Sequence, residues 1–308
     1  MQASRWFKHF RNKAFRKLNS VGLFVEKAPE TRLIVAGYTR SGTTFLANLL
    51  SNAAGARMIH EPLNTMRVLF FKELRNRDSK THLIGNARAR KELMAAFSDS
   101  FRGNRYTNRG TRLFYRSRIV KLVRANFYLD LIAELLPATK ICFIVRHPCA
   151  CIYSRLRLGW DAPDMSNCIE DIYPELNRVQ KELYDSPQSG ARAVAVTWCL
   201  DNLVALKNIK HDQFQFVYFE ELLDSSLQMA QRLLKFAAFD GIRRSAISEA
   251  FLQLSYERER ETRNSNGNWK DNLEPSEIEG ILDVVRTFGL GQLYDLQTHE
   301  PGKMVGSL

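Results

Sequence analysis

The chain has 308 residues, of which 45% are apolar and 25% charged, and its formal net charge is +12 at neutral pH. These values are typical of a globular protein with a large core, and they exclude a disordered or collagen-like chain. No apolar run is long enough to span a bilayer, and the first residues lack the apolar segment of a secretory signal peptide. We therefore expect a cytoplasmic protein with anionic partners.

The five cysteines are not spaced like the ligands of a structural zinc site. Cys149 and Cys151 are separated by one residue, and no second pair completes a set of four ligands. The sequence therefore predicts reduced thiols and no metal site. The other three cysteines are Cys142, Cys168 and Cys199.

Residues 1–28 form a basic segment in which aromatic and cationic residues alternate. The aromatic residues are Trp6, Phe7, Phe10 and Phe15, and the cations are Arg5, Lys8, Arg11, Lys13, Arg16 and Lys17. As a helix, this segment either lies on an anionic membrane surface or docks its aromatic residues on the rest of the chain. No DNA- or RNA-binding motif is present, so nucleic acid is not an expected partner.

The next part of the chain alternates short apolar runs with segments of helical periodicity. The predicted strands are 32–36, 56–59, 119–120 and 140–145, and the predicted helices are 43–54, 64–74 and 125–136. Residues 75–116 are rich in Arg, Asn, Gly and Ser. They predict an insertion on the substrate side of the active site, with a helix near 88–97.

The remaining chain continues the alternation. A helix is expected after Pro148, and the later elements are helices over 168–184, 191–208 and 225–238 with a strand over 214–218. Strands that alternate with helices predict an α/β fold, here a three-layer P-loop type with a parallel sheet flanked by helices on both faces. Without an internal repeat or a linker, residues 29–308 are expected to form a single domain.

The segment Gly37–Thr44, with the sequence GYTRSGTT, joins the first predicted strand to the first predicted helix. A glycine-rich turn there gathers backbone N–H groups at a helix N-terminus, which suits a phosphate or a sulfate. The spacing is that of a Walker P-loop, but Thr43 replaces the lysine that nucleotide-hydrolysing enzymes use. Arg146 ends the strand where a magnesium-binding aspartate is typical, and the cation of the loop is Arg40.

The sequence RSGTTF within and after this turn resembles a loop of the sulfotransferases that use 3′-phosphoadenosine 5′-phosphosulfate (PAPS). The closest resemblance is to carbohydrate-type and bacterial sulfotransferases. It implies that the arginine and the backbone N–H groups hold the phosphosulfate, while the two threonines add hydroxyl donors. The cofactor-binding residues implied by this motif are Arg40, Ser41, Gly42, Thr43, Thr44 and Phe45.

Arg146 and Ser154 have the spacing of the pair that binds the 3′-phosphate of PAPS in this family. An arginine at a strand end presents a fork to a phosphate, and the serine follows about two helical turns later. An arginine at the start of a helix is otherwise electrostatically unfavourable, and a bound anion would relieve this conflict. His147 replaces the aspartate or asparagine that is usual in the family.

Two later segments also resemble the family. A basic stretch before Trp269 implies that Arg263 is a second ligand of the 3′-phosphate, although the family's Arg-Lys-Gly triplet is not intact. The stretch Val217–Leu222 resembles the family's segment near the adenine, with Phe219 in place of a tyrosine. A strand end that enters a helix would give the same pattern.

Sulfuryl transfer needs a base for the acceptor proton and cations near the transferred group. Glu61, in the sequence IHEP after a predicted strand, resembles the Glu-Pro of carbohydrate sulfotransferases, which implies that Glu61 is the base. His60 is a neighbour able to affect it. Arg40 and Lys121 are expected to stabilise charge near the sulfuryl group and the bridging oxygen, and Arg124 either lines the acceptor site or is solvated.

A histidine base is the alternative. His82 lies in the sequence KTHL, which is also the histidine motif of soluble steroid and phenol sulfotransferases. It comes too early in the chain, because Lys121 occupies the place of the motif's lysine and Val123 that of its histidine. We interpret His82 as a surface residue.

The sequence thus predicts a PAPS-dependent sulfotransferase that needs no metal. The expected acceptor is a hydroxyl, chiefly a sugar hydroxyl of a glycan or glycolipid, with direct in-line transfer to it. Two alternatives are a P-loop nucleotide kinase or NTPase and a non-catalytic P-loop protein that binds anions or membranes. The enzyme is expected in the cytoplasm, where the segment 1–28 is a candidate for peripheral membrane contact.

Overall fold

A five-stranded parallel sheet forms the centre of the molecule, with the strand order β3–β5–β2–β6–β7. The computed structural model describes residues 2–27, 30–68, 71–74, 79–98, 101–110, 112–161, 169–187, 189–207, 212–262, 268–294 and 300–302. All the predicted strands are present, with bounds that differ by one or two residues. They are β2 (Thr31–Ala36), β3 (Arg57–His60), β5 (Arg118–Leu122), β6 (Lys140–Val145) and β7 (Phe214–Tyr218).

Side chains alternate between the two faces of the sheet, because successive residues of a strand point in opposite directions. In β2, Leu33 and Val35 belong to one hydrophobic core, whereas Ile34 and Ala36 belong to the other. Both faces are apolar, which explains why the strands read as continuous apolar runs. The predicted three-layer α/β class is confirmed.

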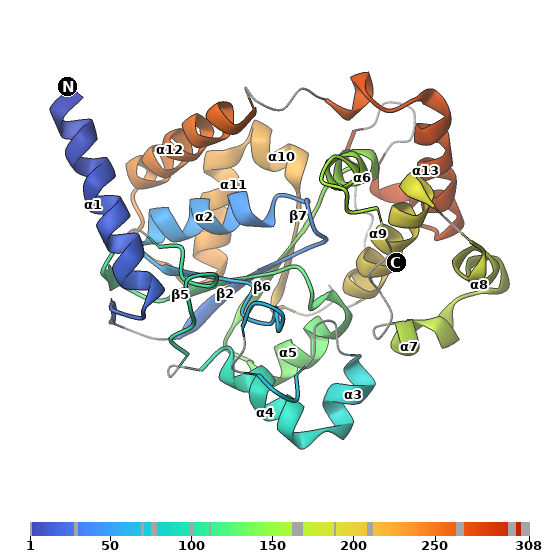
Figure 1. Cartoon of the computed structure of the whole chain (residues 1–308), viewed down its shortest axis with the longest axis horizontal. Helices are drawn as coiled ribbons and strands as arrows, with labels where there is room; N and C mark the ends of the chain where they lie inside the picture. Colours follow the sequence, from blue (N-terminus) through green and yellow to red (C-terminus); the bar gives the residue numbers. More distant parts are fainter. Residues whose placement is uncertain are drawn as a thin grey trace.

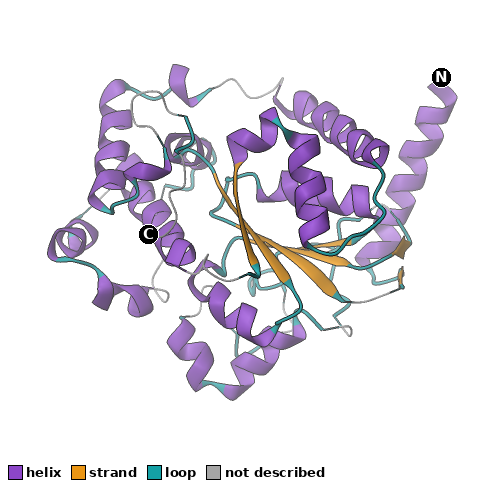
Figure 2. Ribbon diagram, turned by 180° about the vertical axis from the view of Figure 1, so that it is seen from behind, coloured by secondary structure: helices purple, strands orange, loops and turns teal. Residues whose placement is uncertain are grey.

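One core lies under the helix that follows β2 and the helices that follow β7 (Figure 1). These helices are α2 (Thr43–Ala54), α10 (Phe219–Asp224), α11 (Ser226–Phe236) and α12 (Arg244–Thr262). Helices on the opposite face cover the other core (Figure 2). They are α3 (Lys80–Gly85), α4 (Ala87–Ala95), α5 (Leu129–Leu135), α6 (Pro148–Leu156), α9 (Gly190–Lys207) and α13 (Pro275–Thr287).

The first residues form a helix, α1 (Gln2–Ser20), and the end of this helix is fixed to the rest of the chain. Asn19 is buried, its amide donates to the carbonyl oxygen of Arg112 at 2.6 Å, and it accepts a hydrogen bond from the hydroxyl of Tyr115 at 2.9 Å. A second, two-stranded parallel sheet follows, formed by β1 (Val25–Glu26) and β4 (Phe114–Tyr115). The side chains of residues 2–9 are outside the described part, so the positions of Trp6 and Phe7 are too.

Two helix predictions are wrong. Residues 64–68 form turns, and 71–74 are irregular because the carboxylate of Glu92 binds the backbone N–H groups of residues 72, 73 and 74 at 2.7–2.9 Å. The segment 168–184 is broken, since Pro174 ends its first part and an Asn177 capping box begins the next. Its helices are α7 (Ile169–Ile172) and α8 (Arg178–Asp185), and short 3₁₀ turns occur at Asn126–Tyr128, Tyr173–Glu175, Trp269–Asp271 and Gly291–Leu293.

No helix in the described ranges combines the length and the apolar character needed to cross a membrane.

Candidate active site

The predicted site residues gather at the carboxyl edge of the sheet, which is where ligands bind in open α/β folds. The strands β2, β3, β5 and β6 are parallel, so the residues that follow them meet at one edge. A cavity of about 670 Å³ opens there. The predicted site residues that line it are Arg40, Gly42, Thr43, Thr44, Phe45, Glu61, Lys121 and Arg146.

Close packing dictates the glycines of the loop after β2. Gly42 has a φ of 91°, and a Cβ atom there would lie 2.2 Å from the ring of Phe219. A Cβ atom on Gly37 would lie 2.3 Å from the carbonyl oxygen of Ile144 in β6. Arg40 also has a positive φ, of 69°. The loop is therefore a tight backbone cradle in which a larger residue at either glycine would displace its neighbours.

The donors of this cradle come from the start of α2. The first N–H groups of an α-helix have no partner inside the helix, and those of α2 begin at Thr43, which lines the cavity. Ser41 has another role, because it is fully buried and its hydroxyl lies 3.6 Å from the sulfur of Cys151. The backbone N–H of Ser41 donates to the carbonyl oxygen of Tyr38 at 3.1 Å, which closes the turn.

The two motifs that the sequence analysis predicts to bind phosphate groups meet in space. The Nε of Arg40 donates to the hydroxyl of Ser154 at 2.9 Å, and the guanidinium of Arg146 donates to the carbonyl oxygen of Arg40 at 3.2 Å. Phe219 joins them, since its ring packs on Gly42 and lies 4.7 Å from the guanidinium carbon of Arg146. Phe219, which stands where the family has a tyrosine, therefore packs against both motifs.

Glu61 is the centre of a buried polar cluster beside this cradle. It is 8% exposed, and its carboxylate accepts hydrogen bonds from Lys121 at 2.5 Å, from Tyr106 at 3.0 Å and from Arg124. The register of β3 and β5 places His60 opposite Lys121, which brings the lysine to the carboxylate. Glu61 has a φ of 44°, an uncommon conformation for a residue with a side chain.

These charges determine the protonation of the cluster. Burial alone would raise the pKa of Glu61, but Lys121 and Arg124 outweigh it and lower this pKa to about 2. Burial, followed by the charge of Lys121, lowers the pKa of His60 to about 3. Burial also lowers the pKa of Lys121, an effect that the charge of Glu61 opposes. At neutral pH the cluster therefore contains an ionised Glu61 and a neutral His60.

The sequence analysis missed several residues of the cavity. The segment 75–116 contributes Tyr106 and Arg109, and the turn after Glu61 contributes Asn64 and Arg67. The amide of Asn64 donates to the carboxylate of Glu61 at 3.4 Å. The arginine-rich composition of 102–112 was the available signal for Arg109. Trp160, which is 49% exposed, completes this group of lining residues.

The histidine alternative and the motif before Trp269 have different outcomes in the structure. His82 belongs to α3 and does not line the cavity, so the sequence match of KTHL brings no histidine to the carboxylate. Trp269, at the end of the basic stretch that resembles the family, stacks on His147 with ring centroids 4.6 Å apart. This contact packs Trp269 against the residue that follows Arg146. Arg263 is outside the described residues. Within the described part of the chain, no group of three His, Cys, Asp or Glu side chains is arranged to hold a metal ion.

The fold is a three-layer α/β fold with a glycine-rich loop between β2 and α2 at the edge of the cavity. A model of the sulfotransferase family matches residues 32–240, which is more than half of the chain. The chain therefore belongs to the sulfotransferase family. Among curated proteins, none is significantly similar to it in sequence.

Solved structures with a similar chain fold include three sulfotransferases of low sequence identity. That of Alicyclobacillus acidocaldarius is 16% identical, with a TM-score of 0.44, over 86% of this chain and 95% of that one. Mouse SULT7A1 complexed with PAP is 15% identical, with a TM-score of 0.47, over 88% and 87%. STF9 of Mycobacterium avium is 13% identical, with a TM-score of 0.44, over 90% and 79%.

Proposed function

We propose that this enzyme transfers a sulfuryl group from PAPS to a hydroxyl group of its acceptor. The observation that carries the proposal is the contact between the two phosphate-binding motifs. Arg40 and Arg146 lie 106 positions apart in the chain and are hydrogen-bonded to each other, next to the buried Glu61. Family membership supports the reaction type, and the mouse relative was crystallised with PAP, the product that PAPS leaves.

The residues present fit such a donor. The first N–H groups of α2 have no partner inside the helix and begin at Thr43, which lines the cavity, so the backbone can donate to an anion there. Arg40 and the first N–H groups of α2 would hold the 5′-phosphosulfate, and Arg146 with Ser154 would hold the 3′-phosphate. Bound there, PAPS would supply an activated sulfuryl group.

Glu61 is the proposed base for the acceptor hydroxyl. A carboxylate with a pKa of about 2 is ionised at every physiological pH but is a weak base. It therefore takes the proton late, once the attacking oxygen has become acidic through its new bond to sulfur. Lys121 and Arg124 orient the carboxylate, and Lys121 with Arg40 offers positive charge to the oxygens of the transferred group.

The proposed acceptor is a sugar hydroxyl of a glycan or glycolipid. The resemblance of Glu61-Pro62 to carbohydrate sulfotransferases supports it, and so does the exposed ring of Trp160 on the cavity, a flat apolar surface that suits a sugar ring.

The proposed location is the cytoplasm, with a peripheral membrane contact as a further proposal. Cys142, Cys149, Cys151 and Cys199 are buried free thiols, which supports a reducing compartment. On α1, Phe10 is 62% exposed and the neighbouring cations face water, which supports contact with an anionic surface.

Calorimetric titration with PAP in the absence of magnesium tests the donor proposal. We expect PAP to bind, and Arg146→Ala to weaken binding by about 10- to 100-fold, because charge-assisted hydrogen bonds are lost. Arg157→Ala is the matched control, since Arg157 is exposed at the opposite end of α6 from Arg146 and does not line the cavity. Failure of the wild type to bind PAP, together with binding of ATP only with magnesium, would favour a P-loop kinase instead.

A further inference from the structure

A second cavity, of about 560 Å³, continues from the active site toward α1. The two cavities share four lining residues: Thr44, Asn48, Arg109 and Leu254. The two cavities therefore adjoin at these residues, and their combined lining extends from Glu61 to the last turn of α1. We call the part outside the active site the basic groove, defined by Arg16, Lys17, Arg105, Arg109 and Arg112.

The charge of the basic groove has a single sign. Its five cations come from α1 and from the segment 102–112, and no Asp or Glu belongs to its described lining. The hydrogen bonds of Arg109 and Arg112 go to uncharged carbonyl oxygens, those of Tyr106 at 3.2 Å and Asn52 at 2.9 Å. Among the described residues none of the five cations has an ion pair, so their charges are available to an external anion.

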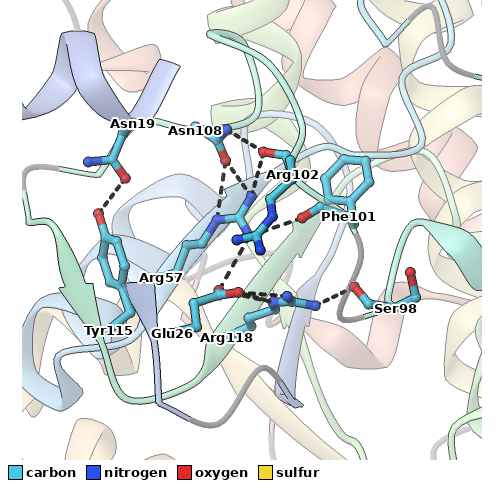
Figure 3. A network of polar contacts seen from close by, with 9 residues as sticks. All are labelled: Asn19, Glu26, Arg57, Ser98, Phe101, Arg102, Asn108, Tyr115 and Arg118. Atoms are coloured by element: carbon cyan, nitrogen blue, oxygen red, sulfur yellow. Dashed lines mark hydrogen bonds and ion pairs between the residues drawn. The ribbon is translucent and has the colours of Figure 1, made fainter. Parts of the chain in front are cut away.

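The groove is elongated and has a firm wall. It follows α2 from Thr44 to Asn52, which corresponds to about 12 Å along the helix. Asn108 and Tyr115 form part of the wall, and Figure 3 shows how a buried polar network holds them. Asn108 accepts from Arg57 at 2.6 Å and 3.2 Å, while Tyr115 is bonded to Asn19.

We propose that the basic groove binds the acidic chain of the acceptor, so that the acceptor is a linear glycan with repeated carboxylate or sulfate groups. This inference rests on the proposed sulfuryl transfer and narrows its substrate class. A chain in the groove enters the active site at Arg109 and presents one of its hydroxyl groups toward Glu61. Two further cations of the active-site cavity, Arg67 and Arg124, extend the positive lining beyond Arg109.

Shape and composition favour a glycan over other polyanions. A bilayer surface is broad and cannot follow a concave lining into a cavity, whereas a linear chain can. Single-stranded nucleic acids bind through exposed aromatic platforms. The aromatic residue among the described lining of the groove is Tyr115, and its ring is buried, with 4% of the residue exposed.

The test uses the full-length protein with PAP bound and alginate oligosaccharides as the acidic probe. We expect the triple variant Arg16→Gln/Lys17→Gln/Arg105→Gln to bind alginate about tenfold more weakly than the wild type, because three exposed ion pairs are lost. Its affinity for PAP should not change, since none of the three residues lines the cofactor cavity. Neutral dextran oligosaccharides should not show this difference.

The matched control is Lys235→Gln/Arg243→Gln/Arg244→Gln, which removes the same charge from exposed positions outside both cavities. We expect its affinity for alginate to stay within about twofold of the wild type, since charges beyond a Debye length are screened. Equal losses in the two triple variants, or no loss in the groove variant, would overturn the proposal. If the groove variant lost binding to vesicles containing phosphatidylglycerol but bound alginate as the wild type does, the result would overturn the proposal in favour of a membrane surface. A wild type that fails to bind PAP would contradict the sulfotransferase function itself.

Discussion

At the residue scale, Glu61 combines backbone strain with a concentration of positive charge. A side-chain-bearing residue at a φ of 44° costs about 1–3 kcal/mol, which its surroundings must offset. Lys121, Arg124 and Tyr106 all donate to its carboxylate, and these bonds fix the strained turn after β3. The charges of Lys121 and Arg124 also lower the pKa of Glu61, so the structure that positions this carboxylate makes it a weak base.

The first prediction concerns the pH dependence of the reaction. The pKa of Glu61 is about 2 and that of His60 about 3, so neither group changes its charge between pH 5 and 8. With saturating PAPS, we expect kcat to show no acid limb from these groups above about pH 5. A histidine base with an ordinary pKa of about 6.5 would instead lower kcat tenfold per pH unit below that value.

Variants of Glu61 and Tyr106 distinguish the proposed base from a residue that only positions it. Glu61→Gln should lower kcat by about 10²- to 10⁴-fold with PAP affinity unchanged, whereas Tyr106→Phe removes one hydrogen bond and should have a smaller effect. If Glu61→Gln kept its kcat, Glu61 would be only a structural residue. The lowered pKa also stabilises the fold at pH values above about 4.5, and this contribution is lost as the pH falls toward 2.

At the element scale, the small sheet β1–β4 and the strands β3 and β5 share one buried carboxylate. Glu26 of β1 binds Arg118 at 2.6 Å and Arg57 at 3.3 Å, and both arginines are almost completely buried. Figure 3 shows this network, which also reaches the carbonyl oxygens of Phe101 and Arg102. It connects the first residues after α1 to the loop that forms the wall of the basic groove.

The second prediction is that Glu26→Gln destabilises the fold by about 3–5 kcal/mol, because two buried guanidinium groups lose their counter-charge. Burial lowers the pKa of Arg57 to about 10, with Glu26 opposing it, so this arginine remains protonated at neutral pH. Urea unfolding followed by circular dichroism measures the loss. Glu30→Gln, at an exposed position of the same region, should change the free energy of unfolding by less than about 0.5 kcal/mol. Similar stabilities of the two variants would show that the network contributes little.

The strands and the phosphate loop could be predicted from the sequence because their signals are local. Apolar runs indicate strands, and the two glycines of the loop have fixed spacing. The wrong helix prediction over 64–74 shows the limit of local signals. The N–H groups of residues 72, 73 and 74 bind the carboxylate of Glu92, which is 18–20 positions away in the chain. Tyr106 could not be predicted either, because its role depends on a contact with Glu61, which is 45 positions away in the chain. By contrast, Pro174 and the capping box at Asn177 were visible breaks in the predicted helix over 168–184.

At the scale of the whole molecule, positive charge is concentrated where the ligands are expected. The sheet brings Arg40, Lys121 and Arg146 to one edge, and α1 with the segment 102–112 extends the positive lining beyond it. Glu61 is the acidic residue among the described lining of the two cavities. Like charges held this closely repel one another, so the unliganded protein stores repulsion that an anionic ligand would relieve.

The last prediction follows from this arrangement. A ligand that binds only the folded protein stabilises it by about 2.7 kcal/mol at 100 times its Kd, which raises the Tm of a protein of this size by roughly 4 °C. We therefore expect PAP without magnesium to raise the Tm by this amount, and Arg146→Ala to show a smaller rise at the same PAP concentration. High salt should reduce the shift, because at 1 M the Debye length falls to about 3 Å. A shift that is insensitive to salt and equal in Arg146→Ala would mean that PAP binds away from these cations. If PAP binding relieves charge repulsion, then Arg146→Ala and high salt should both reduce the rise of the Tm. Agreement between the variant and the salt experiment is therefore a stronger test than the size of either shift.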